Sequence, residues 1–357
     1  MTEGLYARLS EWIRDAYFPT FGHTEFTADD IFHEFKRQHP VQKFKHLEGK
    51  LVDRNTRLPL LDGDITTVIA KFLWEVTDNQ KKPLLRRLGY KRFKLIDRTV
   101  KTLDWASGEG VLPLIFPKDR DTEMELPFVN NIEIYAGDLI CIAGESNRGK
   151  STLCWNFALE NMDKFDVIMW ISEFHPAQTR KRMAFSNMFR EDGSPRVETL
   201  RLDDVYELAQ KIADKPNSLH IIDWIGLRDK FFAIGGILED IQNALTGGIA
   251  IISIQKNESH QLGAGGELSK HNISLYMTVS KLSDYYQRLK LEKVKSPNGS
   301  NPEFKSYRFA CVSNGGQIAD VAEIEDCRVC TGKKYVKGEP CSACDASGYK
   351  IKSFDPF

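Results

Sequence analysis

The 357-residue sequence predicts an α/β protein built on a doubly wound, mostly parallel sheet, with a small, mainly helical domain before it and a cysteine-rich module after it. Three observations predict this class. A glycine-rich loop lies between an apolar run and a helical segment, short apolar runs recur beyond it, and two CxxC pairs lie near the C-terminus. The expected divisions are residues 1–106, a linker at 107–125, the sheet domain at 126–323 and the module at 324–357.

The charge balance neither favours nor excludes a nucleic-acid partner. The chain has 49 basic and 50 acidic residues and a net charge of -1, so a nucleic-acid surface has to arise from local asymmetry. No apolar run is long enough to span a bilayer, and the start lacks the pattern of a secretion signal. We therefore expect a cytoplasmic protein, in the host-cell cytoplasm if it is viral, with no membrane partner.

The first domain alternates amphipathic helices with turns. Apolar spacing predicts helices over residues 5–18, 28–36 and 65–76, the second of them capped by Thr27. Residues 84–96 then read as a helix end, a turn and a strand. This order of elements resembles a winged helix.

Basic residues concentrate near the end of this domain. Between Lys81 and Lys101 they outnumber the single acid, Asp97, and two aromatic residues, Tyr90 and Phe93, lie among them. Such a segment is typical of contact with DNA or RNA phosphates, while a solvated basic face or a surface that docks on an acidic neighbour remains open. The basic residues are Lys81, Lys82, Arg86, Arg87, Lys91, Arg92, Lys94, Arg98 and Lys101.

A complete phosphate-binding loop follows the first apolar run of the sheet domain. Its glycines let backbone N–H groups and a helix N-terminus point at a phosphate, while Lys150 supplies positive charge and Ser151 an oxygen for Mg²⁺. The strand and helix expected on either side argue against a chance match. A nucleotide with Mg²⁺ is therefore the expected ligand, bound by Gly144, Glu145, Ser146, Asn147, Arg148, Gly149, Lys150, Ser151 and Thr152.

Three polar side chains at strand ends complete this pattern. Asp223 follows the apolar run 219–222, where a carboxylate can hold Mg²⁺ through water. Glu173 follows the run after the loop and can polarise an attacking water, and Gln255 follows the run 249–254 and can sense a γ-phosphate. The alternative is a helix-capping residue for Asp223 and for Glu173, and an ordinary polar strand end for Gln255.

The phosphate-binding loop with Lys150, followed in order by Glu173, Asp223 and Gln255, resembles the RecA/DnaB superfamily of P-loop ATPases. In detail it resembles the DnaB-type replicative helicases. The resemblance covers about residues 126–320 and rests on the segments 137–144, 170–183, 221–227 and 253–257. It implies a RecA-like sheet, ATP hydrolysis with Glu173 activating water, and a Gln255 that couples hydrolysis to a DNA-facing loop at 258–269. The glycines of that loop predict mobility. The resemblance also implies self-association into a ring, expected to be a hexamer, or into a filament.

Two lysines, Lys293 and Lys295, lie where DnaB-type helicases usually place an arginine that reaches the nucleotide of a neighbouring subunit. A Lys-x-Lys pair resembles the RecA recombinases instead, in which both lysines contact nucleotide across a subunit interface. Both are therefore candidate catalytic residues that act in trans, with a weaker point charge than an arginine fork. Two lysines on the exposed side of a strand are the alternative.

The two CxxC pairs form a candidate metal centre. Four thiolates at this spacing close a tetrahedral Zn²⁺ site, formed by Cys327, Cys330, Cys341 and Cys344. The knuckles resemble the zinc-binding repeats of DnaJ chaperones over a few dozen residues. We expect structural zinc, which supplies the folding free energy of so small a module, rather than free thiols or a redox pair.

The leading hypothesis is an oligomeric ATPase that moves along DNA, most simply a single-strand translocase or helicase in replication or recombination. A nucleotide-gated DNA-binding adaptor or loader with slow turnover is one alternative, and a recombinase filament is another. The N-terminal domain resembles neither that of bacterial DnaB nor a RecA arm, which suggests a different partner or a DNA-binding element.

Overall fold

A computed structural model of the chain describes residues 2–21, 25–38, 62–77, 84–89, 92–95, 110–173, 175–227 and 231–352. The chain divides into two compact units, Met1–Trp105 and Ala106–Phe357. Among the described residues, no helix is both long enough and apolar enough to cross a membrane.

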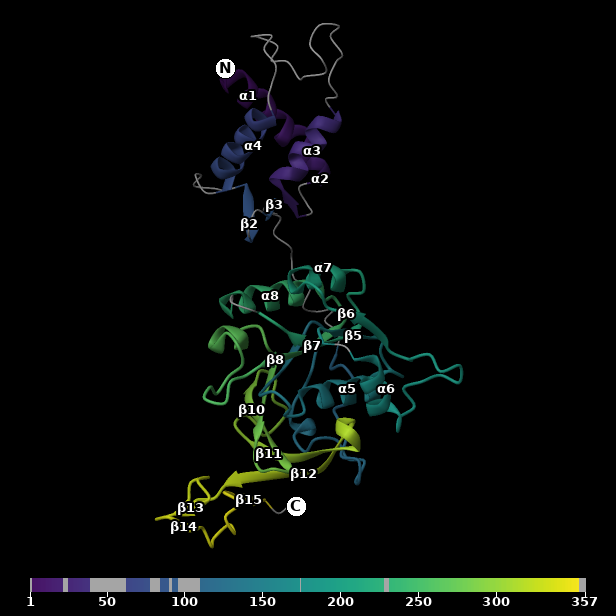
Figure 1. Ribbon diagram of the computed structural model, residues 1–357, viewed down its shortest axis with the longest axis vertical. Helices are drawn as coiled ribbons and strands as arrows, with labels where there is room; N and C mark the ends of the chain where they lie inside the picture. Colours follow the sequence, from purple (N-terminus) through teal and green to yellow (C-terminus); the bar gives the residue numbers. More distant parts are fainter. Residues whose placement is uncertain are drawn as a thin grey trace. The chain divides into compact units, whose positions relative to one another are not determined.

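The N-terminal unit is mainly helical, with a three-stranded antiparallel sheet of order β1-β3-β2 (Figure 1). All three expected helices are present, and Thr27 caps the second one. The Thr27 hydroxyl accepts a hydrogen bond from the Asp30 N–H at 3.2 Å, and the Asp30 carboxylate accepts one from the Thr27 N–H. The elements are α1 (Thr2–Trp12), the π-helix η1 (Ile13–Tyr17), α2 (Phe18–Phe21), β1 (Phe26–Thr27), α3 (Ala28–Gln38), α4 (Asp62–Thr77), β2 (Leu85–Gly89) and β3 (Arg92–Leu95).

The strand expected after α4 is present as β3, but a second strand, β2, replaces the expected helix end. Residues 85–95 contain an antiparallel pair of strands, in which Leu85 faces Leu95 and Arg87 faces Phe93. Leu85 and Phe93 are buried in the core of the unit, so a strand period of two replaces the helical one. Several residues of the expected basic segment lie outside the described residues, namely Lys81, Lys82, Tyr90, Lys91, Asp97, Arg98 and Lys101.

The C-terminal unit is organised around a ten-stranded sheet of order β15-β12-β11-β10-β9-β4-β8-β7-β5-β6. The strands from β9 to β6 in this order run parallel, and those from β15 to β10 join antiparallel. The strands are β4 (Leu139–Gly144), β5 (Val167–Ile171), β6 (Glu198–Arg201), β7 (Leu219–Ile225), β8 (Ile249–Gln255), β9 (Leu275–Lys281), β10 (Tyr286–Val294), β11 (Ser306–Val312), β12 (Gln317–Asp326) and β15 (Tyr349–Ile351).

Helices cover both faces of the parallel part, with α5 and α6 on one side and α7 and α8 on the other (Figure 1). Alternate residues of β4 separate the two layers, since Ile140 and Ile142 pack with the α5 layer and Leu139 and Cys141 with the α7 and α8 layer. The expected doubly wound, mostly parallel sheet is thus confirmed. The helices are η3 (Val129–Asn131), α5 (Lys150–Asn161), α6 (Pro176–Met183), η4 (Val205–Glu207), α7 (Leu208–Ala213), η5 (Phe231–Ala233), α8 (Ile234–Ala244), η6 (Gly266–Lys270) and η7 (Ser313–Gly315).

The strands from β9 to β12 depart from the alternation of strands and helices that a doubly wound sheet over residues 126–323 predicts. From β9 onward the strands follow one another as an antiparallel meander through β10, β11 and β12. Their alternating burial reflects a sheet with one face on the core. Leu114 and Phe116, in the segment expected as a linker, are buried in the same core.

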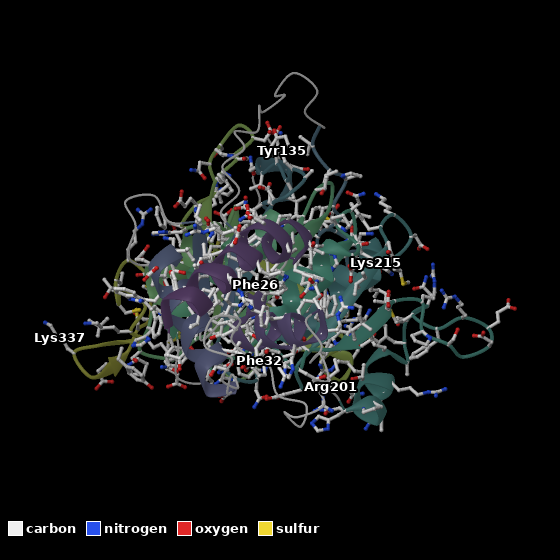
Figure 2. All side chains as sticks on the ribbon, turned by 90° about the horizontal axis from the view of Figure 1, so that it is seen from above. Phe26, Phe32, Tyr135, Arg201, Lys215 and Lys337 are labelled. Carbon is white, nitrogen blue, oxygen red and sulfur yellow. The ribbon has the colours of Figure 1, made fainter. Side chains whose placement is uncertain are left out.

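The cysteine-rich segment is joined to this sheet. The end of β12 pairs with β15, with Ile324 opposite Ile351 and Asp326 opposite Tyr349. Between these strands lies a small hairpin of β13 (Tyr335–Val336) and β14 (Glu339–Pro340). Figure 2 shows Lys337, in the turn of this hairpin, extending away from the rest of the unit.

Candidate nucleotide site and metal centre

The phosphate-binding loop makes a tight turn from the end of β4 into α5. Gly149, the residue before the helix, has φ 90°, and Asn147 has φ 58°. A Cβ added at Gly149 would lie 2.7 Å from Cys311 Sγ, so both the backbone conformation and the space require glycine. The turn presents the N-terminus of α5, whose partial positive charge favours an anion.

Lys150 is buried and holds its ammonium group inside the loop. Its Nζ donates to the carbonyl oxygens of Gly144 at 2.9 Å and Glu145 at 2.8 Å and to Gln255 Oε1 at 3.3 Å. Burial lowers the pKa of Lys150, and the nearby Asp223 carboxylate acts in the opposite direction. Because these three acceptors are neutral, the positive charge stays available to a phosphate.

Gln255 connects the end of β8 to the loop. Besides accepting from Lys150, it donates through Nε2 to Ser146 Oγ at 3.0 Å. The neighbouring Glu145 carboxylate forms ion pairs with Lys256, at 3.5 Å, and with Arg148, at 3.3 Å. The strand end expected to sense the γ-phosphate is therefore in direct contact with both the lysine and the tip of the phosphate loop.

Asp223 lies in β7, and its carboxylate is buried next to the helix start. Its Oδ1 accepts from Ser253 Oγ at 3.0 Å. Burial raises the pKa of Asp223, whereas hydrogen bonds from the Ser151 and Ser253 hydroxyls and the charge of Lys150 lower it. The hydroxyl of Ser151 and the carboxylate of Asp223 thus lie together, and this pair of hard oxygen donors fits Mg²⁺.

Glu173 follows β5 with an exposed side chain. It lines a cavity of about 910 Å³ together with Trp224, Phe231, Gln255 and His260. Glu173 and Gln255 therefore face one open space beside the phosphate loop, as a residue that activates water and a γ-phosphate sensor require.

Three contacts that the sequence did not indicate fix the phosphate loop and its helix to the end of β11 and the turn η7. Thr152 Oγ1 donates to the Gly315 carbonyl at 2.8 Å, and Asn156 Nδ2 donates to the Gly316 carbonyl at 2.8 Å. Gly149 packs against Cys311, at the end of β11. In the sequence, the adjacent glycines Gly315 and Gly316 are the signal that could have indicated a turn here.

The structure does not bring Lys293 and Lys295 to the loop of their own chain. Lys293 is opposite Tyr276 and therefore level with Cys141, near the start of β4 and away from its loop end. Its Nζ donates to the carbonyl oxygens of Lys270 at 2.7 Å and His271 at 3.0 Å, and burial lowers its pKa. Lys295 is exposed. Within one subunit these lysines lack the position for catalysis.

The loop at 258–269, expected to be mobile, is tied to the sheet. The Gly263 N–H donates to the Tyr276 hydroxyl at 3.0 Å, and the Ala264 N–H donates to the Gln255 carbonyl at 2.8 Å. A Cβ added at Gly263 would lie 3.0 Å from the Ala143 Cβ. Glycine at this position permits a close approach of the loop to β4.

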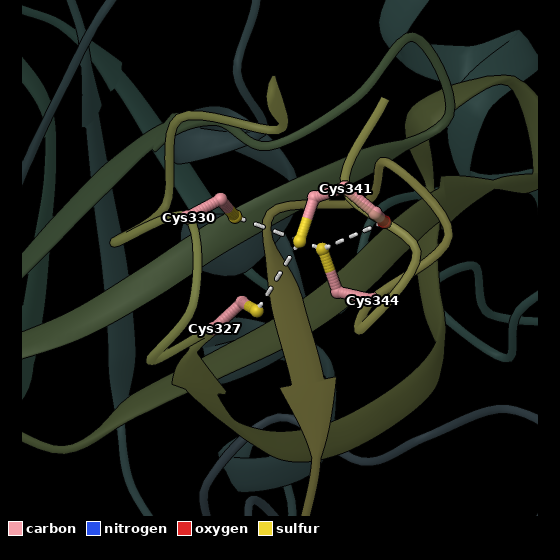
Figure 3. Close-up of side chains that lie close together, drawn as sticks. All are labelled: Cys327, Cys330, Cys341 and Cys344. Carbon is pink, nitrogen blue, oxygen red and sulfur yellow. Dashed lines mark hydrogen bonds between the residues drawn. The ribbon is translucent and has the colours of Figure 1, made fainter. Parts of the chain in front are cut away.

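The four cysteines form a compact cluster with their sulfur atoms turned toward one another (Figure 3). All four are buried, and their sulfur atoms lie within 4.8 Å of one another. The distances are 3.9 Å between Cys327 and Cys341 and 3.7 Å between Cys330 and Cys344. Zinc–sulfur bonds of about 2.3 Å in a tetrahedron require sulfur atoms about 3.8 Å apart, so the cluster fits Zn²⁺. The backbone N–H of Cys330 lowers the pKa of Cys327 to about 7, whereas burial raises the pKa of Cys341 to about 11.

Comparison with known proteins gave matches among solved structures. No family model matches the sequence, and no curated protein matches it. The RadB recombinase has a similar structure with TM-score 0.41 and 18% sequence identity, over 52% of this chain and 91% of that chain. A KaiC-like protein from the hyperthermophilic archaeon Pyrococcus horikoshii OT3 is similar with TM-score 0.42 and 13% identity, over 58% of this chain and 97% of that chain. The fold class itself rests on the strand order and the two helical layers.

Proposed function

We propose that the chain is an ATPase that self-associates and acts on DNA, as a translocase or helicase on a single strand. The observation that carries the proposal is the meeting of Lys150, Asp223 and Gln255 at the phosphate loop, with Glu173 in the adjoining cavity. Strands far apart in the sequence supply these groups, and each has the chemistry that phosphoryl transfer requires.

The chemistry follows from the positions of the side chains. Lys150 and the start of α5 hold the phosphates, and Ser151 and Asp223 would hold Mg²⁺, which neutralises charge on the β- and γ-phosphates. Glu173 takes a proton from a water in the cavity as the water oxygen bonds to the γ-phosphorus. The bond to the bridging oxygen breaks, ADP keeps the electron pair, and phosphate leaves. Gln255 exchanges the hydrogen bond that its Nε2 donates to Ser146 for one donated to the γ-phosphate, and so reports its presence.

A basic hairpin supports DNA as the partner. In the N-terminal unit, Arg86 lies directly opposite Lys94, and Arg87 covers the ring of Phe93 with its guanidinium 5.7 Å from the ring centroid. Like charges on opposite strands repel each other, and a bound phosphate backbone relieves that repulsion. This arrangement supports the predicted winged-helix-like DNA contact in this unit.

Self-association is supported by what one subunit lacks. Glu173 is exposed to an open cavity, and Lys293 and Lys295 lie away from the loop of their own chain. A cation from a neighbouring copy would complete the charge at the γ-phosphate and make hydrolysis depend on assembly into a ring or filament. In a Lys-x-Lys arrangement both lysines are candidates for that contact.

One observation favours a second function, a nucleotide-gated DNA-binding adaptor with slow turnover. Lys293 is held by two carbonyl oxygens of its own chain, and reaching a neighbouring nucleotide would break both bonds. An assembly in which that lysine stays in place would bind ATP and hydrolyse it slowly.

The test is ATP hydrolysis by zinc-replete protein with and without single-stranded DNA. For the motor we expect strong stimulation by DNA, and Glu173→Gln should lower the stimulated rate by about 100-fold or more while nucleotide binding is kept. Glu191→Gln, an exposed acid on another loop, is the matched control and should behave as wild type. Binding of ATP and DNA without stimulated hydrolysis would reject the motor in favour of the adaptor.

A further inference from the structure

Arg182, near the end of α6, has a partly buried side chain. Its Nε is buried and has no hydrogen-bond partner among the described residues. Among the described residues, no carboxylate forms an ion pair within 4.0 Å of the Arg182 guanidinium group. The neighbouring Arg180 stacks over Phe189. A buried guanidinium N–H that lacks an acceptor is unfavourable, so the position favours a partner that the described residues do not supply.

The guanidinium group lies beside the turn that borders the phosphate loop. A Cβ added at Gly315 would be 3.7 Å from Arg182 Nε, 3.9 Å from its Nη2 and 3.6 Å from Thr152 Oγ1. Arg182 and the Thr152 hydroxyl therefore lie close to the same small residue. Thr152 is in the first turn of α5, at the helix N-terminus where a phosphate is held.

The electrostatic surroundings agree with this placement. Burial raises the pKa of Asp223. Hydrogen bonds from Ser151 and Ser253, the charge of Lys150 and, as the smallest of these effects, the charge of Arg182 lower it. Burial raises the pKa of Cys311, and Thr152 and then Arg182 lower it. Arg182 thus acts on the loop from the side of Cys311 and η7, while Gln255 and Glu173 approach from the cavity.

We propose that Arg182 is a nucleotide-binding residue that pairs with a phosphate retained in ADP, at the Thr152 side of the loop. The inference rests on the proposed ATPase function. In a phosphate-binding loop the backbone surrounds the α- and β-phosphates and the lysine reaches the β- and γ-phosphates. The γ-phosphate belongs with Lys150, Gln255 and Glu173, which leaves the guanidinium to the phosphates that do not transfer. Arg182 accordingly sets the affinity for ATP and ADP alike.

The test is equilibrium titration of the full-length, zinc-loaded protein with fluorescent ADP and with a fluorescent non-hydrolysable ATP analogue, both with Mg²⁺. Arg182→Ala should weaken both ligands by about tenfold or more, and Arg182→Lys, which keeps the charge but loses the planar fork, by a smaller factor. Arg180→Ala removes the same charge from the same helix and should leave both affinities within about twofold of wild type.

The possible results separate the two proposals. Unchanged ADP affinity in Arg182→Ala, or a loss for the ATP analogue alone, would overturn the assignment of Arg182 while the ATPase proposal stands. Wild-type protein that binds neither nucleotide would overturn both. A thermal melt of each variant identifies misfolding, and if Arg182→Ala melts early, the folded Arg182→Lys variant decides by the same criterion of equal losses for both ligands.

Discussion

The nucleotide site and the cysteine cluster lie in the same unit but are built in opposite ways. The first gathers side chains from β4, β7 and β8, which neighbour one another only because of the strand order. The second comes from one short segment, residues 327–344, with two knuckles and almost no apolar core of its own. The nucleotide site therefore depends on the whole sheet, whereas the cluster needs only four thiols from one short segment.

One strand connects the two sites. β12 starts at Gln317, next to the Gly316 carbonyl that Asn156 of the loop helix holds, and ends at Asp326, next to Cys327. β11 pairs with β12 over residues 317–324, and β15 pairs only with its last residues, 324–326. Loss of the cluster should therefore free the far end of β12 and leave its nucleotide end in place.

The largest expected effect is that of removing the metal. We expect one zinc per chain in purified protein, and Cys330→Ser or a strong chelator should remove it and unfold the knuckles. The metal supplies about 10 kcal/mol or more in zinc-finger peptides, far beyond what this small hairpin can provide. Trypsin should then cleave rapidly at the lysines of residues 333–337, while nucleotide affinity changes by less than about twofold.

Zinc content by elemental analysis and limited trypsin digestion test this expectation. Cys154→Ser, at a buried cysteine far from the cluster in sequence, is the control and should retain the metal. A hairpin that resists trypsin after complete metal removal would show that the segment folds without zinc. A large loss of nucleotide affinity in the same sample would show that the two sites are not separable.

A smaller effect, but one on the whole sheet, is expected from Gly149→Ala. The added Cβ would meet Cys311 Sγ at 2.7 Å, and the residue has φ 90°, which an L-side chain rarely adopts. We expect a loss of about 1–3 kcal/mol in the free energy of unfolding and about tenfold or more in ATP affinity, with zinc content unchanged. Urea unfolding and nucleotide titration measure the two losses.

The double variant Gly149→Ala/Cys311→Ala identifies the cause. Removing the sulfur opens the space but leaves the backbone strain, so part of the lost affinity should return. If the double variant binds no better than the single one, the contact with β11 is not what restricts the loop.

The same contrast explains how far the sequence could predict this protein. The loop at 144–152, the apolar runs that became β4, β5, β7 and β8, and the four cysteines are short-range patterns, and each was found from spacing alone. The fold class and the metal cluster followed from them. Local chemistry at the end of a parallel strand also marked Asp223 and Gln255 as neighbours of the loop.

What the sequence missed depends on pairing between distant segments. Nothing near Cys311 or Gly315 shows that they border the loop, because that contact arises from the order of β11 and β12 in the sheet. The burial of Lys293 against its own chain and the close packing of Gly263 on β4 are likewise products of tertiary structure. Leu85 was assigned to a helix end instead of the strand β2 because a short apolar run fits either period.

The smallest expected effect distinguishes the sheet from the cluster by pH. His220 is fully buried in β7, where its Nδ1 accepts from the Trp170 indole at 3.1 Å and its Nε2 donates to the Lys215 carbonyl at 2.9 Å. Burial lowers its pKa from the ordinary value of 6.5, so the unfolded chain binds the proton more readily than the folded one. The contribution of neutral His220 is thus present above about pH 6.5 and decreases, by at most about 1.4 kcal/mol per pH unit, as the pH falls below it.

His220→Gln should be less stable than wild type at neutral pH, but its stability should fall less steeply between pH 7 and pH 5. Urea unfolding followed by tryptophan fluorescence gives the free energy of unfolding of both proteins at each pH. Zinc content is measured in the same samples, so a loss of stability that both proteins share can be assigned to protonation of the thiols. Equal slopes in the two proteins would mean that His220 takes up its proton without opening the sheet. In that case the acid sensitivity of this unit would belong to the cysteine cluster rather than to the strands that hold the nucleotide site.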